Sequence, residues 1–130
     1  MSQPLDASFG KAKRLLDAQD YSRVFEEPDV KAFHKNLLLL AKINNGPEHR
    51  LGLVIAKKNV RQAVQRNRIK RIAREFVRKV PGGVPLDVVV LARRGLDKMD
   101  NAQLASLFQQ QWGKLARHAS KVESNTTRGS

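Results

Sequence analysis

The feature that most constrains the fold is the segment 60–79, where apolar side chains recur along one helical face and arginines occupy the opposite face. The apolar positions follow the spacing i, i+3, i+4, i+7 of a half-buried helix; they are Ile69, Ile72, Ala73, Phe76, Val77 and Val80. At 100° per residue, the opposite face carries Arg71, Arg74 and Arg78. We predict a helix over about 60–79, capped by Asn59, whose apolar side covers a sheet.

Strand-like segments flank this helix on both sides. Segment 36–43 is nearly continuously apolar, and segment 50–56 follows it after the turn sequence Asn-Asn-Gly-Pro, so the two predict an antiparallel hairpin. Pro81-Gly82-Gly83 ends the helix, and the β-branched run within 86–92 predicts a central strand. A strand, a helix and a strand in succession predict a parallel pair joined by a crossover.

Two further helices carry capping signals. Asp17 and Asp20 predict a helix over 18–26, and Asp100 with Gln103 predicts a last helix whose apolar stripe runs to about 119. The expected order is α-β-β-α-β-α, an α/β domain of the α+β two-layer sandwich type with a mixed sheet of three to four strands. We expect one domain over 11–119, an N-terminal tail over 1–10, and a disordered C-terminal tail over 120–130.

The positive charge is concentrated in the predicted basic helix and the loop before it. The chain has a formal net charge of +13, and residues 57–79 hold ten basic side chains against the single acid Glu75. Such crowding destabilises a folded domain through repulsion, and the arginine fork matches phosphate oxygens, so a polyanion is the expected partner. A merely solvated face and a membrane-surface helix are the alternatives, although the apolar side is needed to cover the sheet.

Residues that could support protein-based catalysis are sparse. The chain has no cysteine, which excludes disulfides, thiolate zinc sites and cysteine nucleophiles. His34, His49 and His118 are isolated from one another and lack metal-ligand spacing. We expect no catalytic residue and no metal ligand in the polypeptide. Without an apolar run of bilayer length or a secretory signal, we expect a soluble, cytoplasmic protein.

Two runs of residues carry a resemblance to a known family. Ala56-Lys57-Lys58-Asn59-Val60-Arg61, followed by Arg66-Asn67-Arg68-Ile69-Lys70-Arg71, resembles the signature of the protein subunit of bacterial ribonuclease P. The resemblance extends through the order of elements over about 11–118. It implies a fold similar to the ribosomal protein S5 domain 2-like fold, with a left-handed crossover where parallel strands usually have a right-handed one.

The resemblance also implies a function and its residues. The family's protein is an RNA-binding cofactor of a ribonucleoprotein endoribonuclease, a hydrolase that removes the 5′ leader from precursor tRNA. Magnesium is held by the catalytic RNA, and the polypeptide alone is inactive and binds no cofactor. We expect one protein per RNA and a monomer when free. The implied contacts to the RNA subunit are Lys57, Lys58, Arg61, Arg66, Asn67, Arg68, Lys70, Arg71 and Arg74.

The implied contacts to the leader are aromatic. Tyr21 and Phe25 match the two aromatic positions of the family's first helix, although packing explains them equally well. A third aromatic, which some relatives carry in the first strand, is not evident in the aliphatic run 37–40. A structural RNA-binding protein, such as a ribosomal protein or an assembly factor, remains the alternative function. A DNA-binding helix-turn-helix protein is disfavoured because a strand precedes the basic helix.

Overall fold

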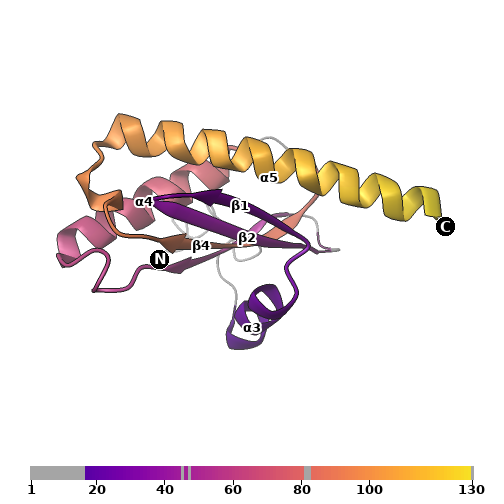
Figure 1. Cartoon of the computed structure of the whole chain (residues 1–130), viewed down its shortest axis with the longest axis horizontal. Helices are drawn as coiled ribbons and strands as arrows, with labels where there is room; N and C mark the ends of the chain where they lie inside the picture. Colours follow the sequence, from indigo (N-terminus) through magenta and orange to yellow (C-terminus); the bar gives the residue numbers. More distant parts are fainter. Residues whose placement is uncertain (1–16, 45, 47, 81–82, 130) are drawn as a thin grey trace, which may run out of the picture.

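The computed structural model describes residues 17–44, 46, 48–80 and 83–129, with side chains as far as residue 122. The predicted N-terminal tail over 1–10 lies outside the described residues. A four-stranded sheet carries two long helices on one face and a short helix on the other (Figure 1). In chain order the elements are α3 (Ala18–Glu26), β1 (Val30–His34), β2 (Leu37–Ile43), β3 (Arg50–Val54), α4 (Ala63–Lys79), β4 (Leu86–Ala92), the 3-10 helix η1 (Leu96–Lys98) and α5 (Asn101–Gly129).

The strand order is β1-β2-β4-β3, which corrects the predicted hairpin. Strand β4 lies between β2 and β3, antiparallel to β2 and parallel to β3, so the segments 36–43 and 50–56 do not pair. Crossing one intervening strand requires only about 10 Å, which the short link between β2 and β3 spans easily. Every residue of β4 except Leu91 is buried, and this burial explains the central place of the strand. The predicted parallel crossover β3-α4-β4 is confirmed.

Strand β1 was absent from the expected order α-β-β-α-β-α, and the observed order is α-β-β-β-α-β-α. It pairs antiparallel with β2, from Val30 opposite Ala41 to His34 opposite Leu37. Its side chains alternate between buried and exposed positions, because one face of this edge strand lies against α5. A five-residue strand that contains lysine and histidine has too few apolar positions for its period to be recognised.

The main core lies between the sheet and the helices α4 and α5. Ile69, Ala73 and Val77 of α4 are fully buried, and Ile72 and Phe76 pack against the same cluster, so the predicted apolar stripe is confirmed. The stripe of α5 is also buried; its members are Leu104, Leu107, Phe108, Trp112, Leu115 and Ala119. The amphipathic pattern of α4 thus directs its basic side away from the sheet.

Two of the three predicted helix caps are confirmed, and the third is wrong. At α3, Asp20 donates its backbone N–H to Asp17 Oδ1 at 2.9 Å, and at α5, Gln103 donates to Asp100 Oδ1 at 2.8 Å. Asn59 does not cap α4, which begins at Ala63; its Nδ2 donates instead to the Ala92 carbonyl at 3.0 Å. This bond attaches the loop before α4 to the end of β4.

Helix α5 runs to Gly129, whereas the sequence predicts its end near 119 and a disordered tail after it. Adding one residue to an existing helix requires far less free energy than nucleating one, so the polar residues that follow 120 extend α5 at little cost. Within the described residues, no helix has both the length and the apolarity needed to cross a membrane.

Candidate nucleic-acid interface

Helix α4 and the loop before it bring the predicted RNA-contacting residues onto one side of the molecule. We call this the basic surface and define it as Lys57, Lys58, Arg61, Arg66, Asn67, Lys70, Arg71 and Arg74. All of these side chains are exposed except Arg66 and Lys70, which are partly buried. Among the described residues, none of them forms an ion pair with a carboxylate. The surface therefore carries positive charge that no neighbouring acid neutralises.

Arg66 holds the loop against the helix. Its Nη1 donates to the backbone carbonyls of Val60 and Arg61, each at 3.0 Å. Two carbonyl oxygens that would otherwise face solvent are satisfied by one guanidinium group. The loop that carries Lys57, Lys58 and Arg61 is thereby fixed relative to α4, so the basic surface is a pre-arranged set of cations.

Arg68 connects α4 to the start of α5, a role that the sequence analysis missed. Its Nε donates to Gln65 Oε1 at 2.8 Å, and its Nη1 donates to Asn101 Oδ1 at 2.8 Å. Its Nη2 donates to the carbonyls of Asp97 at 3.2 Å and Met99 at 2.9 Å. Four of the five guanidinium N–H groups are used inside the protein, which leaves one for a phosphate. No local signal reveals the connection to α5, because Asn101, Asp97 and Met99 lie about thirty residues away.

We predict that Arg68→Ala lowers the free energy of unfolding by about 2 kcal/mol, because partly buried carbonyls lose a charged donor. Arg68→Lys should restore little of it, since an ammonium group cannot reproduce the planar fork. The matched control is Arg74→Ala, an exposed substitution on the same helix, which should stay within about 0.5 kcal/mol of wild type. Urea denaturation followed by circular dichroism measures all three. Equal stabilities for Arg68→Ala and Arg74→Ala would contradict the connecting role.

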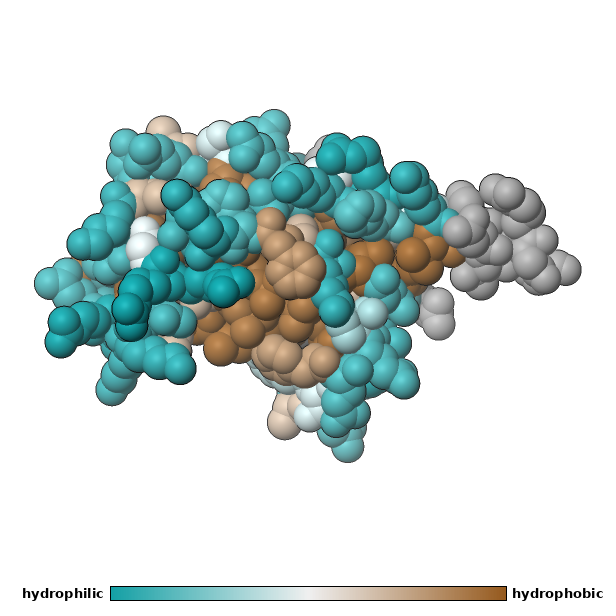
Figure 2. Space-filling view, viewed as in Figure 1, coloured by the Kyte–Doolittle hydropathy of each residue, from teal (hydrophilic) through white to brown (hydrophobic). Residues whose placement is uncertain are grey.

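On the other face of the sheet, the described residues leave some apolar side chains exposed or only partly buried. Helix α3 packs Tyr21 and Val24 over Leu40 and Val89. The next row of residues across the sheet is aligned by the strand registers: Phe33 is exposed, and Leu38, Leu91 and Val54 are partly buried. We call this row, together with the exposed Phe25 of α3, the open sheet surface. Figure 2 shows a brown apolar patch in the middle of this view, bordered by teal hydrophilic side chains.

The two aromatics predicted to contact the leader differ in how far their rings are already engaged within the protein. Tyr21 Oη accepts a hydrogen bond from the Leu53 backbone N–H at 2.9 Å, and its ring lies so close to Gly52 that a Cβ there would come within 2.7 Å of it. Tyr21 is therefore engaged in docking α3. Phe25 stacks on Tyr21 with ring centroids 6.5 Å apart and is 42% exposed. Phe33 in β1 is 62% exposed, whereas the run 37–40 contains no aromatic residue.

Two arginines that the sequence analysis did not single out lie at the border of the open sheet surface. Arg93 and Arg94 follow β4 directly and are exposed. Lys57 and Lys58 follow the end of the parallel neighbour β3, so both pairs emerge at the same end of the sheet. An apolar, aromatic surface with a cationic border at this end has the chemistry that single-stranded nucleic acid requires.

A buried ionic network fixes α3 to the other end of the sheet. Arg50 binds Asp87 with two bonds, Nε to Oδ1 at 2.9 Å and Nη2 to Oδ2 at 2.8 Å, and its Nη2 also reaches Asp20 Oδ1 at 3.2 Å. Burial raises the pKa of Asp20, but the backbone N–H of Asp17 and the charges of Arg50 and Arg23 outweigh burial and lower that pKa overall. The hydrogen bond to Asp87 raises the pKa of Arg50. Asp20 and Arg50 therefore stay charged at neutral pH.

Together, the fold and the basic surface define a small α+β domain suited to binding a polyanion. The family model described as Ribonuclease P matches residues 9–116. The chain is 46% identical over 110 residues to the ribonuclease P protein component of Marinobacter nauticus, covering 85% of this chain and 83% of that protein. It is 45% identical over 117 residues to the one from Pseudomonas aeruginosa, covering 89% and 87%. The chain therefore belongs to the family of bacterial ribonuclease P protein components.

Solved structures agree with this assignment. The ribonuclease P protein of Staphylococcus aureus superposes with a TM-score of 0.70 at 27% identity, covering 82% of this chain and 99% of that one. The protein from Thermotoga maritima gives a TM-score of 0.64 at 26% identity, covering 81% and 96%. The resemblance seen in the sequence is confirmed, and membership places the chain with RNA-binding proteins of tRNA processing.

Proposed function

We propose that this chain is the RNA-binding cofactor of ribonuclease P, the ribonucleoprotein that removes the 5′ leader from precursor tRNA. The basic surface binds the catalytic RNA, and the open sheet surface holds the leader. The observation that carries the proposal is the pairing of these two surfaces on one small domain, with exposed cations on α4 and exposed aromatics on the opposite face of the sheet. A single protein can thus contact the RNA subunit and the substrate simultaneously.

The contact with the catalytic RNA rests on unneutralised charge. Each phosphate that a lysine or arginine neutralises releases a condensed counterion, and this release favours binding. Exposed guanidinium groups such as Arg71 and Arg74 can also form two parallel bonds to one phosphate. The fixed loop carrying Lys57 and Lys58 adds cations in a constant position relative to α4. We propose one protein per catalytic RNA and a monomer when free.

The contact with the leader rests on stacking. The leader is single-stranded, and its bases can stack on Phe25 and Phe33 while its phosphates approach Lys57, Lys58, Arg93 and Arg94. Mature tRNA has no leader and would leave this surface empty. The contact with the leader thereby gives precursor tRNA a higher affinity than mature tRNA.

The hydrolysis itself is assigned to magnesium ions held by the RNA, and the polypeptide contributes no catalytic residue and binds no cofactor of its own. Its contribution is electrostatic. Precursor tRNA and catalytic RNA are both polyanions, and the cations of the basic surface and of Arg93 and Arg94 offset part of their repulsion. A lower magnesium concentration should then be enough for the same fraction of catalytic RNA to bind precursor tRNA.

The test is reconstitution with bacterial ribonuclease P RNA and precursor tRNA at low magnesium. We expect the chain to accelerate leader release from precursor tRNA, with no cleavage by the protein alone. Phe33→Ala should weaken binding of precursor tRNA by about 5- to 150-fold, the loss of one stacked base, and leave binding of mature tRNA unchanged. Leu38→Ala on the same surface removes no aromatic ring and is the control. No acceleration by the wild-type chain would favour a structural RNA-binding protein instead.

A further inference from the structure

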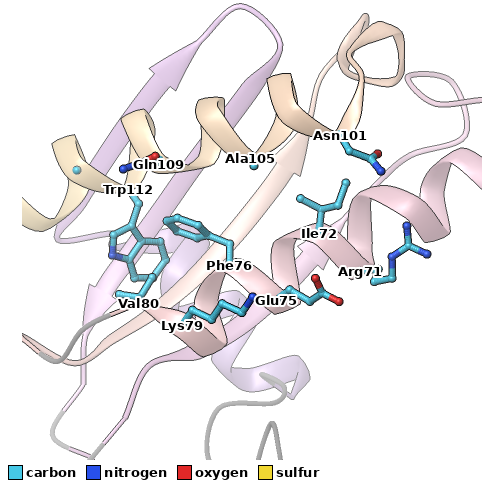
Figure 3. Close-up of a pocket in the computed structure, with 11 residues that line it drawn as sticks. Arg71, Ile72, Glu75, Phe76, Lys79, Val80, Asn101, Ala105, Gln109 and Trp112 are labelled. Atoms are coloured by element: carbon cyan, nitrogen blue, oxygen red, sulfur yellow. The ribbon is translucent and has the colours of Figure 1, made fainter.

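A groove between α4 and α5 lies beside the basic surface and shares only Arg71 with it. It has a volume of about 560 Å³, within the range of small-molecule sites in proteins. Ile72 and Phe76 of α4 and Trp112 of α5 line it with apolar side chains that point toward one another (Figure 3). The rings of Phe76 and Trp112 meet edge to face with centroids 5.8 Å apart. The groove thus offers an aromatic floor.

The rim of the groove is polar and has a net positive charge. Arg71 and Lys79 are exposed on the α4 side, with Glu75 between them. Gln109 and Asn101 contribute amide groups from the α5 side. Asn101 Oδ1 already accepts from Arg68, so the amide of Asn101 remains a donor at the rim. A ligand with a flat aromatic ring, polar atoms at the edge of the ring and a negatively charged group attached to it would match both the floor and the rim of the groove.

Gly113 keeps the groove open at the α5 side. A glycine inside a helix costs about 1 kcal/mol relative to alanine, so its presence in α5 calls for a reason. Packing is not that reason, because a Cβ at this position would meet only Arg117 Nη1, at 3.6 Å, an ordinary contact. The position lines the groove, so a larger side chain there would reduce the space available to a ligand.

We propose that this groove receives a single unpaired base of an RNA strand bound along α4, with the adjoining phosphates held by Arg71 and Lys79. The proposal rests on the proposed function, since it requires the chain to bind RNA. Arg71 belongs both to the basic surface and to the rim of the groove, so a strand that follows the basic surface passes the groove entrance. Charge decides against an apolar peptide as the occupant, because exposed cations at the rim attract phosphates.

The test uses Trp112, the single tryptophan of the chain, as the reporter. Gly113→Leu fills the groove and favours the helix, so the fold should be kept, which a melting curve verifies. Gln110→Leu adds the same side chain at an exposed position of α5 outside the groove and is the control. The affinity of each variant for bacterial ribonuclease P RNA is measured at fixed salt, together with quenching of Trp112 fluorescence.

We expect Gly113→Leu to weaken binding about 5- to 150-fold, the loss of one stacked base, with Gln110→Leu unchanged. RNA should quench Trp112 in wild type and in Gln110→Leu, and less in Gly113→Leu. Equal affinities for the two variants, or RNA binding without any change in Trp112 emission, would overturn the groove as a base site and leave the proposed function standing. Failure of the wild-type chain to bind this RNA would instead contradict the proposed function.

Discussion

Raising monovalent salt from 50 to 200 mM should weaken binding of the catalytic RNA by about 10³- to 10⁵-fold, if about six to ten phosphates are contacted. Contacts in this number are expected because the basic surface has seven cations, four on α4 and three in the loop before it. No acid among the described residues pairs with them. Filter binding at a fixed magnesium concentration measures the effect. A nearly flat response would mean that phosphate contacts do not drive the complex.

Arg50→Met should cause the largest loss of stability of any single substitution considered, about 3 kcal/mol. The side chains of Asp20 and Asp87 are only 7% and 8% exposed, and without Arg50 both carboxylates lose their shared cation. The value lies at the lower end for a broken buried pair because Arg50 itself is 32% exposed. Thermal and urea unfolding at neutral pH measure the loss.

The matched control for Arg50→Met is Lys42→Met, which removes a looser pair. Lys42 Nζ lies 3.8 Å from Asp29 Oδ1, and both side chains are partly exposed, so the loss should stay below about 1 kcal/mol. Comparable losses in the two variants would show that the Arg50 network contributes no more than a surface pair does.

Acid should remove the contribution of this network. The pKa of Asp20 is lower in the folded chain than its ordinary value of 3.8, so the folded state favours the charged carboxylate. That stabilisation is present above pH 4 and is lost as the pH falls through the folded-state pKa. The stability gap between wild type and Arg50→Met should therefore narrow as the pH falls below about 4.

Local patterns in the sequence were sufficient to predict the helices and the location of the basic residues. The apolar stripe from Ile69 to Val80 identified α4, and the Asp17 and Asp100 caps marked the starts of α3 and α5. These signals are local, since a helix satisfies its backbone within itself and needs only one apolar face. The same reasoning placed the RNA-contacting candidates on one surface.

The sheet was harder to predict because strand order depends on contacts between distant segments. Segments 36–43 and 50–56 had the spacing of a hairpin, yet β4 from far along the chain inserts between them. Strand β1 escaped detection because only two of its five residues are buried, and the position of Phe33 was missed with it. The roles of Arg68 and Arg50 were equally hidden, because their acceptors come from other elements.

The most direct measurement compares the salt dependence of RNA binding in two double variants, Arg71→Ala with Arg74→Ala and, as the control, Lys114→Ala with Arg117→Ala on the exposed side of α5. If the basic surface of α4 binds phosphates of the catalytic RNA, the first pair should reduce the slope of log K against log salt by about 2, and the control pair should leave it unchanged. Equal slopes for the two double variants would contradict the account.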